Sequence, residues 1–267
     1  MIRSHFGLED NPFSMREALE LLPHQKEIFD TIKVHCQQGG LCVVMGEPGT
    51  GKSVIKQAVI DHNPKKMITP AIARTLHTYP NTLQILCEAF DIDVKAREST
   101  REKLLIEAAW KLNHEGKMIV PIIDDAHLMH MDCLRKLRLL FEDFPKGHNL
   151  VLFAQMDLMN KLHLLVNADI KSRITYSVKV PKLNPDDIKA FMFAQFDRVK
   201  LGHNVFSEDA VALIVRSSEG ILRRTRNLCI SAMLGAVRDR KRSVGLDQVN
   251  RVLLQPHWRK ENDMETV

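Results

Sequence analysis

The chain has 267 residues and a net charge of +5, with 45% hydrophobic and 27% charged residues. This composition excludes disordered and fibrous proteins, and no apolar run approaches the ~18–20 residues that cross a bilayer. Because the N-terminus lacks the apolar core of a signal peptide and the five cysteines form no C-x-x-C pair, we expect a cytoplasmic protein with neither a disulfide framework nor a zinc ribbon.

Short apolar runs of strand type alternate with longer helical patterns up to about residue 180. This alternation predicts a parallel sheet with helices on both faces. Between the strands, one helix is expected to begin at a capping box, Ser99–Glu102, and another to cover Met131–Phe144. The expected strands are Leu41–Met45, Met67–Ile72, Met118–Asp124, Leu150–Ala154 and Ile174–Val180.

The pattern changes after Val180, where Pro181 begins a break and Asn184 with Pro185 forms a helix start. From there the chain predicts helices alone: Asp186–Val199, Glu208–Ser217, Ile221–Val237 and Leu246–Leu253. We therefore expect an α/β domain over residues 1–181, a small helical domain over 182–256 and a tail over 257–267.

A phosphate-loop motif, G-x-x-x-x-G-K-[ST], follows the first expected strand and precedes the helix Val54–Ile60. Its glycines let backbone N–H groups point inward and form an anion nest at a helix N-terminus. Lys52 can reach the β- and γ-phosphates, and the Ser53 hydroxyl can ligate Mg²⁺. The expected nucleotide contacts are Gly46, Glu47, Pro48, Gly49, Thr50, Gly51, Lys52, Ser53 and Val54.

Polar residues end two other strands. Asp124 is expected to hold Mg²⁺, while Asp125 positions the attacking water. Asp125 is one methylene shorter than the glutamate of many ATPases, so we expect slow hydrolysis. Gln155 can contact the γ-phosphate or orient water from a neighbouring strand. His127 and His130 invite a zinc site, which we do not favour because no third cluster supports it.

The positive charge is concentrated near the C-terminus. Between Arg223 and Lys260 there are ten basic and two acidic residues, a net +8, so the rest of the chain carries −3. A polyanionic partner and a solvated helical face both account for such a segment.

With these motifs in place, the chain resembles AAA+ ATPases of the branch that contains ExeA-type and TniB/TnsC-type proteins. Its opening, His5–Ser14, looks like the "FGL…NPF" start of ExeA-like proteins, and Leu22–Gln25 is similar to the short motif before their phosphate loop. Glu219–Arg223 is similar to the lid motif G-x-P-R, with Leu222 in place of the proline. The resemblance implies an AAA+ P-loop fold with a five-stranded parallel sheet and a helical lid.

The resemblance also implies roles for individual residues. Gln155 stands at the sensor 1 position, and either Arg223 or Arg224 is sensor 2, which reaches the nucleotide in cis. Arg173 takes the place of the arginine finger that completes the ATP site of a neighbouring subunit. The implied enzyme uses ATP and Mg²⁺, and is a slow ATPase stimulated by oligomerisation and DNA.

For this branch the resemblance implies a role in transposition and DNA recombination. A homo-oligomer, a hexameric ring or helical filament, binds double-stranded DNA in the ATP state, recruits a DDE transposase and is released on hydrolysis. With aromatic residues at 6%, stacking on single strands is less expected than contact with duplex phosphates. A second basic candidate is Arg238–Arg242. The expected DNA contacts before the third strand are Arg74, Lys95, Arg97, Arg101 and Lys103.

Two other functions stay open. ExeA-like secretion ATPases continue into a membrane span and a peptidoglycan-binding domain, and this sequence reaches Val267 with neither, so we expect the DNA-linked role instead. A helicase loader or initiator would also carry the Asp124–Asp125 pair. The lack of room for a winged helix after residue 260 argues against an origin binder.

Overall fold

The computed structural model describes residues 1–10, 12–13, 21–62, 67–68, 71–72, 78–145 and 150–258. The chain forms two compact units. The α/β unit consists of Leu21–Glu47 and Gly51–Val180, and the helical unit of Met1–Glu20, Pro48–Thr50 and Pro181–Val267. Within the described ranges, we find no helix with the length and apolar character that a membrane span requires.

A five-stranded sheet of order β3-β5-β6-β1-β7 forms the centre of the α/β unit, and each pair of neighbours is parallel. The five-stranded parallel sheet expected from the sequence is therefore confirmed. A separate pair, β2 with β4, has the same register as β3 with β5. Pro121 stands between β4 and β5 and cannot donate to a ladder, which accounts for the interruption. The strands are β1 (Leu41–Met45), β2 (Met67–Ile68), β3 (Ala71–Ile72), β4 (Met118–Ile119), β5 (Ile122–Ile123), β6 (Leu150–Ala154) and β7 (Ile174–Lys179).

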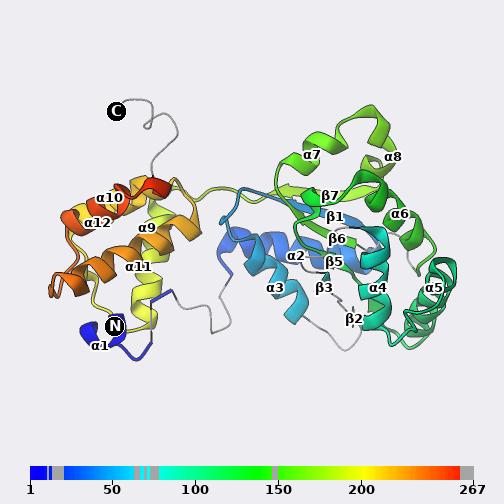
Figure 1. The fold of residues 1–267 in the computed structure, drawn as a ribbon, viewed down its shortest axis with the longest axis horizontal. Coiled ribbons are helices and arrows are strands. Elements are labelled where there is room, and N and C mark those ends of the chain that lie inside the picture. The colour runs from blue at the N-terminus through cyan, green and yellow to red at the C-terminus, as the bar shows by residue number, and fades with distance from the viewer. Residues whose placement is uncertain are drawn as a thin grey trace. The chain divides into compact units, whose positions relative to one another are not determined.

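Helices cover both faces of this sheet (Figure 1). Alternate residues of β1 point to opposite sides: Val43 packs in a core with α4, α5 and α6, while Val44 packs in a second core with α2 and α3. Every residue of β1 and β6 is buried, as expected for central strands of a parallel sheet. The helices are α2 (Pro23–Gln38), α3 (Lys52–Asp61), α4 (Tyr79–Ala89), α5 (Glu98–His114), α6 (Met131–Glu142), α7 (Asp157–Leu162) and α8 (Ala168–Lys171).

The start of α5 differs from the sequence prediction. The helix begins at Glu98 with Arg97 as its N-cap, and no side chain caps it, so the predicted capping box at Ser99 is wrong. The carboxylate of Glu102 instead accepts a hydrogen bond from the Tyr79 hydroxyl. Tyr79 is buried, and a buried hydroxyl needs a partner, so the contact between helices takes the side chain that a capping box would use.

The helical unit contains α1 (Ile2–Phe6), α9 (Pro185–Arg198), α10 (Glu208–Ser218), α11 (Leu222–Arg238) and α12 (Leu246–Leu253) (Figure 1). As predicted, Asn184 caps α9: its side-chain oxygen accepts from the Asp187 N–H at 2.8 Å. The sequence analysis expects residues 1–20 in the α/β domain, whereas the described residues of this segment are grouped with the helical unit. Ile2 and Phe13 pack in the helical core, and the Phe13 ring centroid lies 6.0 Å from that of Phe196.

All five cysteines are free and buried. Four of them, Cys36, Cys42, Cys87 and Cys133, belong to the α/β unit, and Cys229 lies in the core of the helical unit.

Candidate nucleotide-binding site

The phosphate loop leaves the sheet at its carboxyl edge. The Gly46 N–H donates to the Ala154 carbonyl at 3.2 Å, which ties the loop to the end of β6. Gly49 and Gly51 have φ values of 90° and 101°, a left-handed conformation that favours glycine. The Lys52 ammonium donates to the carbonyls of Gly46 at 2.6 Å and Glu47 at 2.9 Å, so it lies along the loop. The N-terminus of α3 follows the loop directly at Lys52, a placement suited to phosphate.

A carboxylate at the end of β5 already has a cationic partner. Asp124 Oδ2 accepts from Lys56 Nζ at 2.5 Å, and Asp124 Oδ1 accepts from the Asp125 N–H at 3.1 Å. The sequence analysis missed Lys56, although it lies one helical turn after Lys52 and hence on the same face of α3.

The donor set fits a magnesium nucleotide. Ser53 is exposed in the first turn of α3, and Asp124 supplies a carboxylate that is paired with a cation. Mg²⁺ typically takes one or two such oxygen ligands together with water and substrate phosphates. Among the residues that the structure describes, no group of three or more His, Cys, Asp or Glu is placed to hold a metal ion, so a metal here would take its other ligands from nucleotide and water.

Asp125 and Gln155 lie at the same edge of the sheet as the loop. Asp125 has a φ of 50° and precedes a short 3-10 helix, Ala126–Leu128. The ring of buried His127 then accepts from the Gln155 N–H at 3.4 Å, which links the end of β5 to the end of β6. The structure thus brings the predicted magnesium, water-positioning and sensor 1 residues to one edge.

Arg173 lies at the opposite edge. It directly precedes β7, whose first residue, Ile174, pairs with Leu41 at the start of β1. The phosphate loop follows the other end of β1, a strand of five residues, or about 16 Å. That length exceeds the reach of an arginine side chain, so Arg173 does not serve the phosphate loop of its own chain. Its side chain is 51% exposed and its Nη2 lies 3.2 Å from Glu142 Oε1.

The two lid arginines differ in their partners. Arg224 Nη1 lies 3.2 Å from Glu219 Oε2, and its guanidinium is 5.5 Å from the centre of the Trp258 ring. The backbone N–H of Arg223 donates to the Gly49 carbonyl at 3.1 Å, within the helical unit as divided above. Arg224 is thus engaged by a carboxylate and an aromatic ring within the helical unit, while the sensor 2 role of Arg223 or Arg224 stays a prediction.

Of the expected DNA contacts, Arg74 lies outside the described residues. Lys95, Arg97 and Lys103 are exposed around the start of α5, while Arg101 is half-buried. In the second basic candidate, Arg238–Arg242, the Arg242 guanidinium donates to the His5 carbonyl. One of the cations of this segment is therefore already in a hydrogen bond.

Residues 34–162 match the family model described as AAA domain. Over 250 residues the chain is 26% identical to General secretion pathway protein A of Aeromonas hydrophila, and the aligned part is 88% of this chain and 45% of that protein. The chain thus spans less than half the length of this curated relative.

Solved structures share the fold at low identity. The Aeropyrum pernix ORC2 protein, solved as ADPNP–ADP complexes, superposes with a TM-score of 0.73 and 13% identity, over 97% of this chain and 75% of that chain. The Aeropyrum pernix ORC1 protein in complex with DNA gives a TM-score of 0.67 and 16% identity, over 89% of this chain and 66% of that chain. The chain therefore has the fold of the AAA+ P-loop NTPases, and its residues 34–162 are similar to the AAA domain model.

Proposed function

We propose that this chain is an ATPase that works as an oligomer. Each ATP-binding site is completed by Arg173 of a neighbouring copy. The supporting observation is the separation described above: the phosphate loop and Arg173 lie at opposite ends of the parallel strands. An arginine so placed, exposed and remote from its own loop, suits a site formed between two copies.

In this mechanism Lys52 holds the β- and γ-phosphates, while Ser53 and Asp124 would hold the metal. Mg²⁺, when bound, neutralises charge on the phosphates. Asp125 accepts a proton from the attacking water or orients it, and Gln155 contacts the γ-phosphate. An arginine from a neighbouring subunit stabilises the charge of the transferring phosphoryl group, an effect worth about 10³–10⁵ in kcat in enzymes that use one.

The target we propose for the oligomer is duplex DNA in the cytoplasm. Exposed Lys95, Arg97 and Lys103 supply phosphate contacts that do not depend on sequence. The likeness to an ORC1 protein solved with DNA is compatible with this choice. The finer proposal is a TniB/TnsC-like transposition role: a hexameric ring or helical filament forms on DNA with ATP, recruits a DDE transposase and is released by hydrolysis.

Electron microscopy and filter binding with duplex DNA test this function. With a non-hydrolysable ATP analogue and Mg²⁺ we expect ordered rings or filaments, and an affinity that falls steeply between 50 and 200 mM salt, by about 10³-fold if six phosphates are contacted. ADP should weaken the binding. DNA binding that is indifferent to both nucleotide and salt would contradict the proposal.

A secretion-linked ATPase is the second candidate, and one observation favours it: the 26% identity over 250 residues to General secretion pathway protein A. This function predicts nucleotide-dependent self-association without duplex DNA. Analytical ultracentrifugation with the same analogue, with and without DNA, separates the two candidates. Assembly that needs no DNA and gains nothing from it would favour the secretion role.

A further inference from the structure

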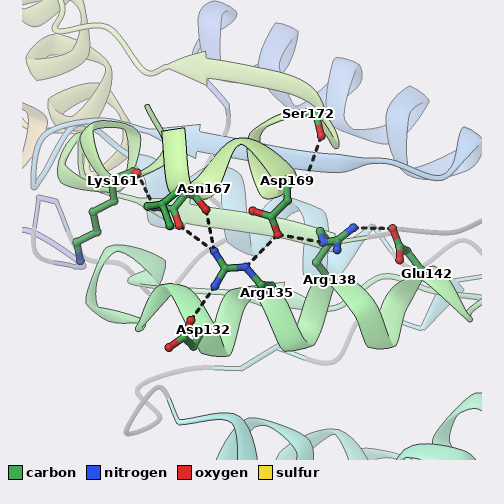
Figure 2. Close-up of polar contacts among 9 residues, drawn as sticks. Asp132, Arg135, Arg138, Glu142, Lys161, Asn167, Asp169 and Ser172 are labelled. Carbon is green, nitrogen blue, oxygen red and sulfur yellow. Dashed lines mark hydrogen bonds and ion pairs between the residues drawn. The ribbon is translucent and has the colours of Figure 1, made fainter. Parts of the chain in front are cut away.

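A network of ionic and polar contacts surrounds Arg135 on α6 (Figure 2). The Arg135 guanidinium donates from Nε to Asp169 Oδ2 at 3.0 Å and from Nη1 to Asp132 Oδ1 at 2.7 Å. Its Nη2 donates to the Val166 carbonyl at 3.2 Å and to Asn167 Oδ1 at 3.1 Å. Desolvation is the largest single influence on the pKa of Asp169 and raises it, but the hydrogen bond and charge of Arg135, the backbone N–H of Ile170 and the charge of Arg138 together outweigh it, so the net shift is downward. One arginine therefore anchors the segment that leads into α8.

The network continues from Arg135 to Arg138, about one turn further along α6, and from there through Glu142 to Arg173, which precedes β7. Arg138 Nε lies 4.0 Å from Asp169 Oδ2, and Arg138 Nη1 donates to Glu142 Oε1 at 2.6 Å. The same Glu142 oxygen is 3.2 Å from Arg173 Nη2. One carboxylate thus holds two guanidinium groups, one of them 12% exposed and the other 51% exposed.

The contact between Glu142 and Arg173 can restrict where the Arg173 guanidinium lies. Arg138 is nearly buried and donates to Glu142 at 2.6 Å, with Asp169 at the longer distance of 4.0 Å, so it restricts the rotamers of Glu142. Glu142 engages Nη2 of Arg173, and a guanidinium has five N–H donors in a rigid fork, so others stay available for a phosphate. An exposed arginine without such a contact would lose more side-chain entropy on reaching a partner.

The other end of the network reaches the nucleotide edge. Asn167 Nδ2 donates to the Lys161 carbonyl at 2.8 Å, and Lys161 Nζ donates to the His127 carbonyl at 2.6 Å. His127 follows Asp125 by two residues and contacts Gln155. A continuous set of contacts therefore joins the residues beside the acid pair to the segment that carries Arg173. Figure 2 shows its middle part, from Lys161 and Asn167 to Arg138 and Glu142.

We propose that Glu142 is a positioning residue for Arg173, held in place by Arg138, and that it prepares Arg173 for the ATP site of a neighbouring copy. This inference rests on the proposed function, in which Arg173 acts on a neighbour. Glu142 has no role in the ATP site of its own chain.

The test uses Glu142→Gln in the full chain, assembled on duplex DNA with ATP and Mg²⁺. Because small misplacements of a reacting group cost up to about 10²-fold, we expect kcat to fall about tenfold to a hundredfold, with KM for ATP unchanged. Glu115→Gln is the matched control, since Glu115 forms an exposed pair with Lys117 at 2.9 Å, outside the proposed ATP and DNA sites, and should keep wild-type turnover.

Mixed oligomers separate positioning from a structural defect. Lys52→Ala cannot hold ATP but keeps Glu142 and Arg173, so adding it to Glu142→Gln should restore turnover at the intact sites of the Glu142→Gln copies. Arg173→Ala mixed with Lys52→Ala should behave in the same way, whereas Glu142→Gln mixed with Arg173→Ala should stay slow.

The outcomes distinguish the two proposals. If Arg173→Ala alone keeps full turnover, or is not rescued by Lys52→Ala, the shared ATP site fails and the role of Glu142 fails with it. If Arg173→Ala behaves as expected but Glu142→Gln has wild-type kcat, or is not rescued by Lys52→Ala, the positioning role of Glu142 alone is overturned.

Discussion

Asp125 has a φ of 50°, in the left-handed region that aspartate and asparagine enter more readily than other residues with a β-carbon. A glutamate there would have the longer reach of many ATPases but would lose the local hydrogen bonding that eases this conformation. The backbone therefore gives a physical reason for the shorter acid at this position.

The same geometry makes Asp125→Asn a clean substitution, because asparagine keeps the shape and the backbone preference while removing the charge. If Asp125 handles the attacking water, we expect ATP binding to be retained and kcat to fall by about 10²-fold or more. Equilibrium binding of a fluorescent ATP analogue and steady-state phosphate release measure the two effects. A normal rate in this variant would remove Asp125 from the mechanism.

Asp125→Ala is the contrasting variant. It removes the same carboxylate but places alanine in the left-handed region, at a cost of about 1 kcal/mol. We therefore expect a lower midpoint of urea unfolding for Asp125→Ala than for Asp125→Asn, at similarly reduced turnover.

At the scale of elements, the end of α11 is joined to α12 by one acid. Asp239 accepts hydrogen bonds from both Arg251 nitrogens Nη1 and Nη2, and from Gln248 Nε2 at 2.7 Å. The Arg251 hydrogen bond, followed by that of Gln248, lowers the pKa of Asp239 to about 2. Asp239 therefore stays charged in the folded state at pH values where it would be protonated in the unfolded chain.

This shift sets a pH window for stability. A lowered folded-state pKa stabilises the fold above the unfolded value of about 3.9, and the contribution is lost as pH falls through about 2. We expect wild type to unfold at higher urea than Asp239→Asn at pH 5, and the difference to shrink between pH 4 and pH 2. A difference that is constant with pH would rule out the charge of Asp239 as its cause.

The elements also show what the sequence can predict. The strands β1 and β6 and the helix α12 match their predicted bounds, since the two strands are continuous apolar runs and the helix alternates apolar and polar faces. The helices α7 and α8 were not predicted, because they are short and are joined by the exposed apolar residues Leu164, Leu165 and Val166, which hide any amphipathic pattern. The start of α5 was wrong because Glu102 serves a contact with another helix.

At the scale of the whole molecule, the same distinction between local and distant contacts applies to the candidate site. The phosphate loop and the acid pair are each a continuous stretch of sequence, so both could be found as motifs. Two other residues depend on contacts that no local sequence pattern records. Lys56 pairs with an acid 68 positions away, and Glu142, at the end of α6, contacts Arg173, which precedes β7. The grouping of Phe13 with the helical unit is of the same kind.

The distribution of the five buried cysteines has a practical consequence for measuring stability. Burial raises the pKa of Cys133 to about 11 and also raises that of Cys229, so few thiolates form while the fold is closed. Alkylation rates therefore report local opening, with Cys229 reporting the helical unit and the other four the α/β unit. With Mg²⁺ and a non-hydrolysable ATP analogue, mass spectrometry should find slower alkylation of Cys42 in β1 and of Cys36 in the neighbouring α2 than without nucleotide. Comparison with Cys229 would then show, without any introduced label, whether nucleotide stabilises one unit or both.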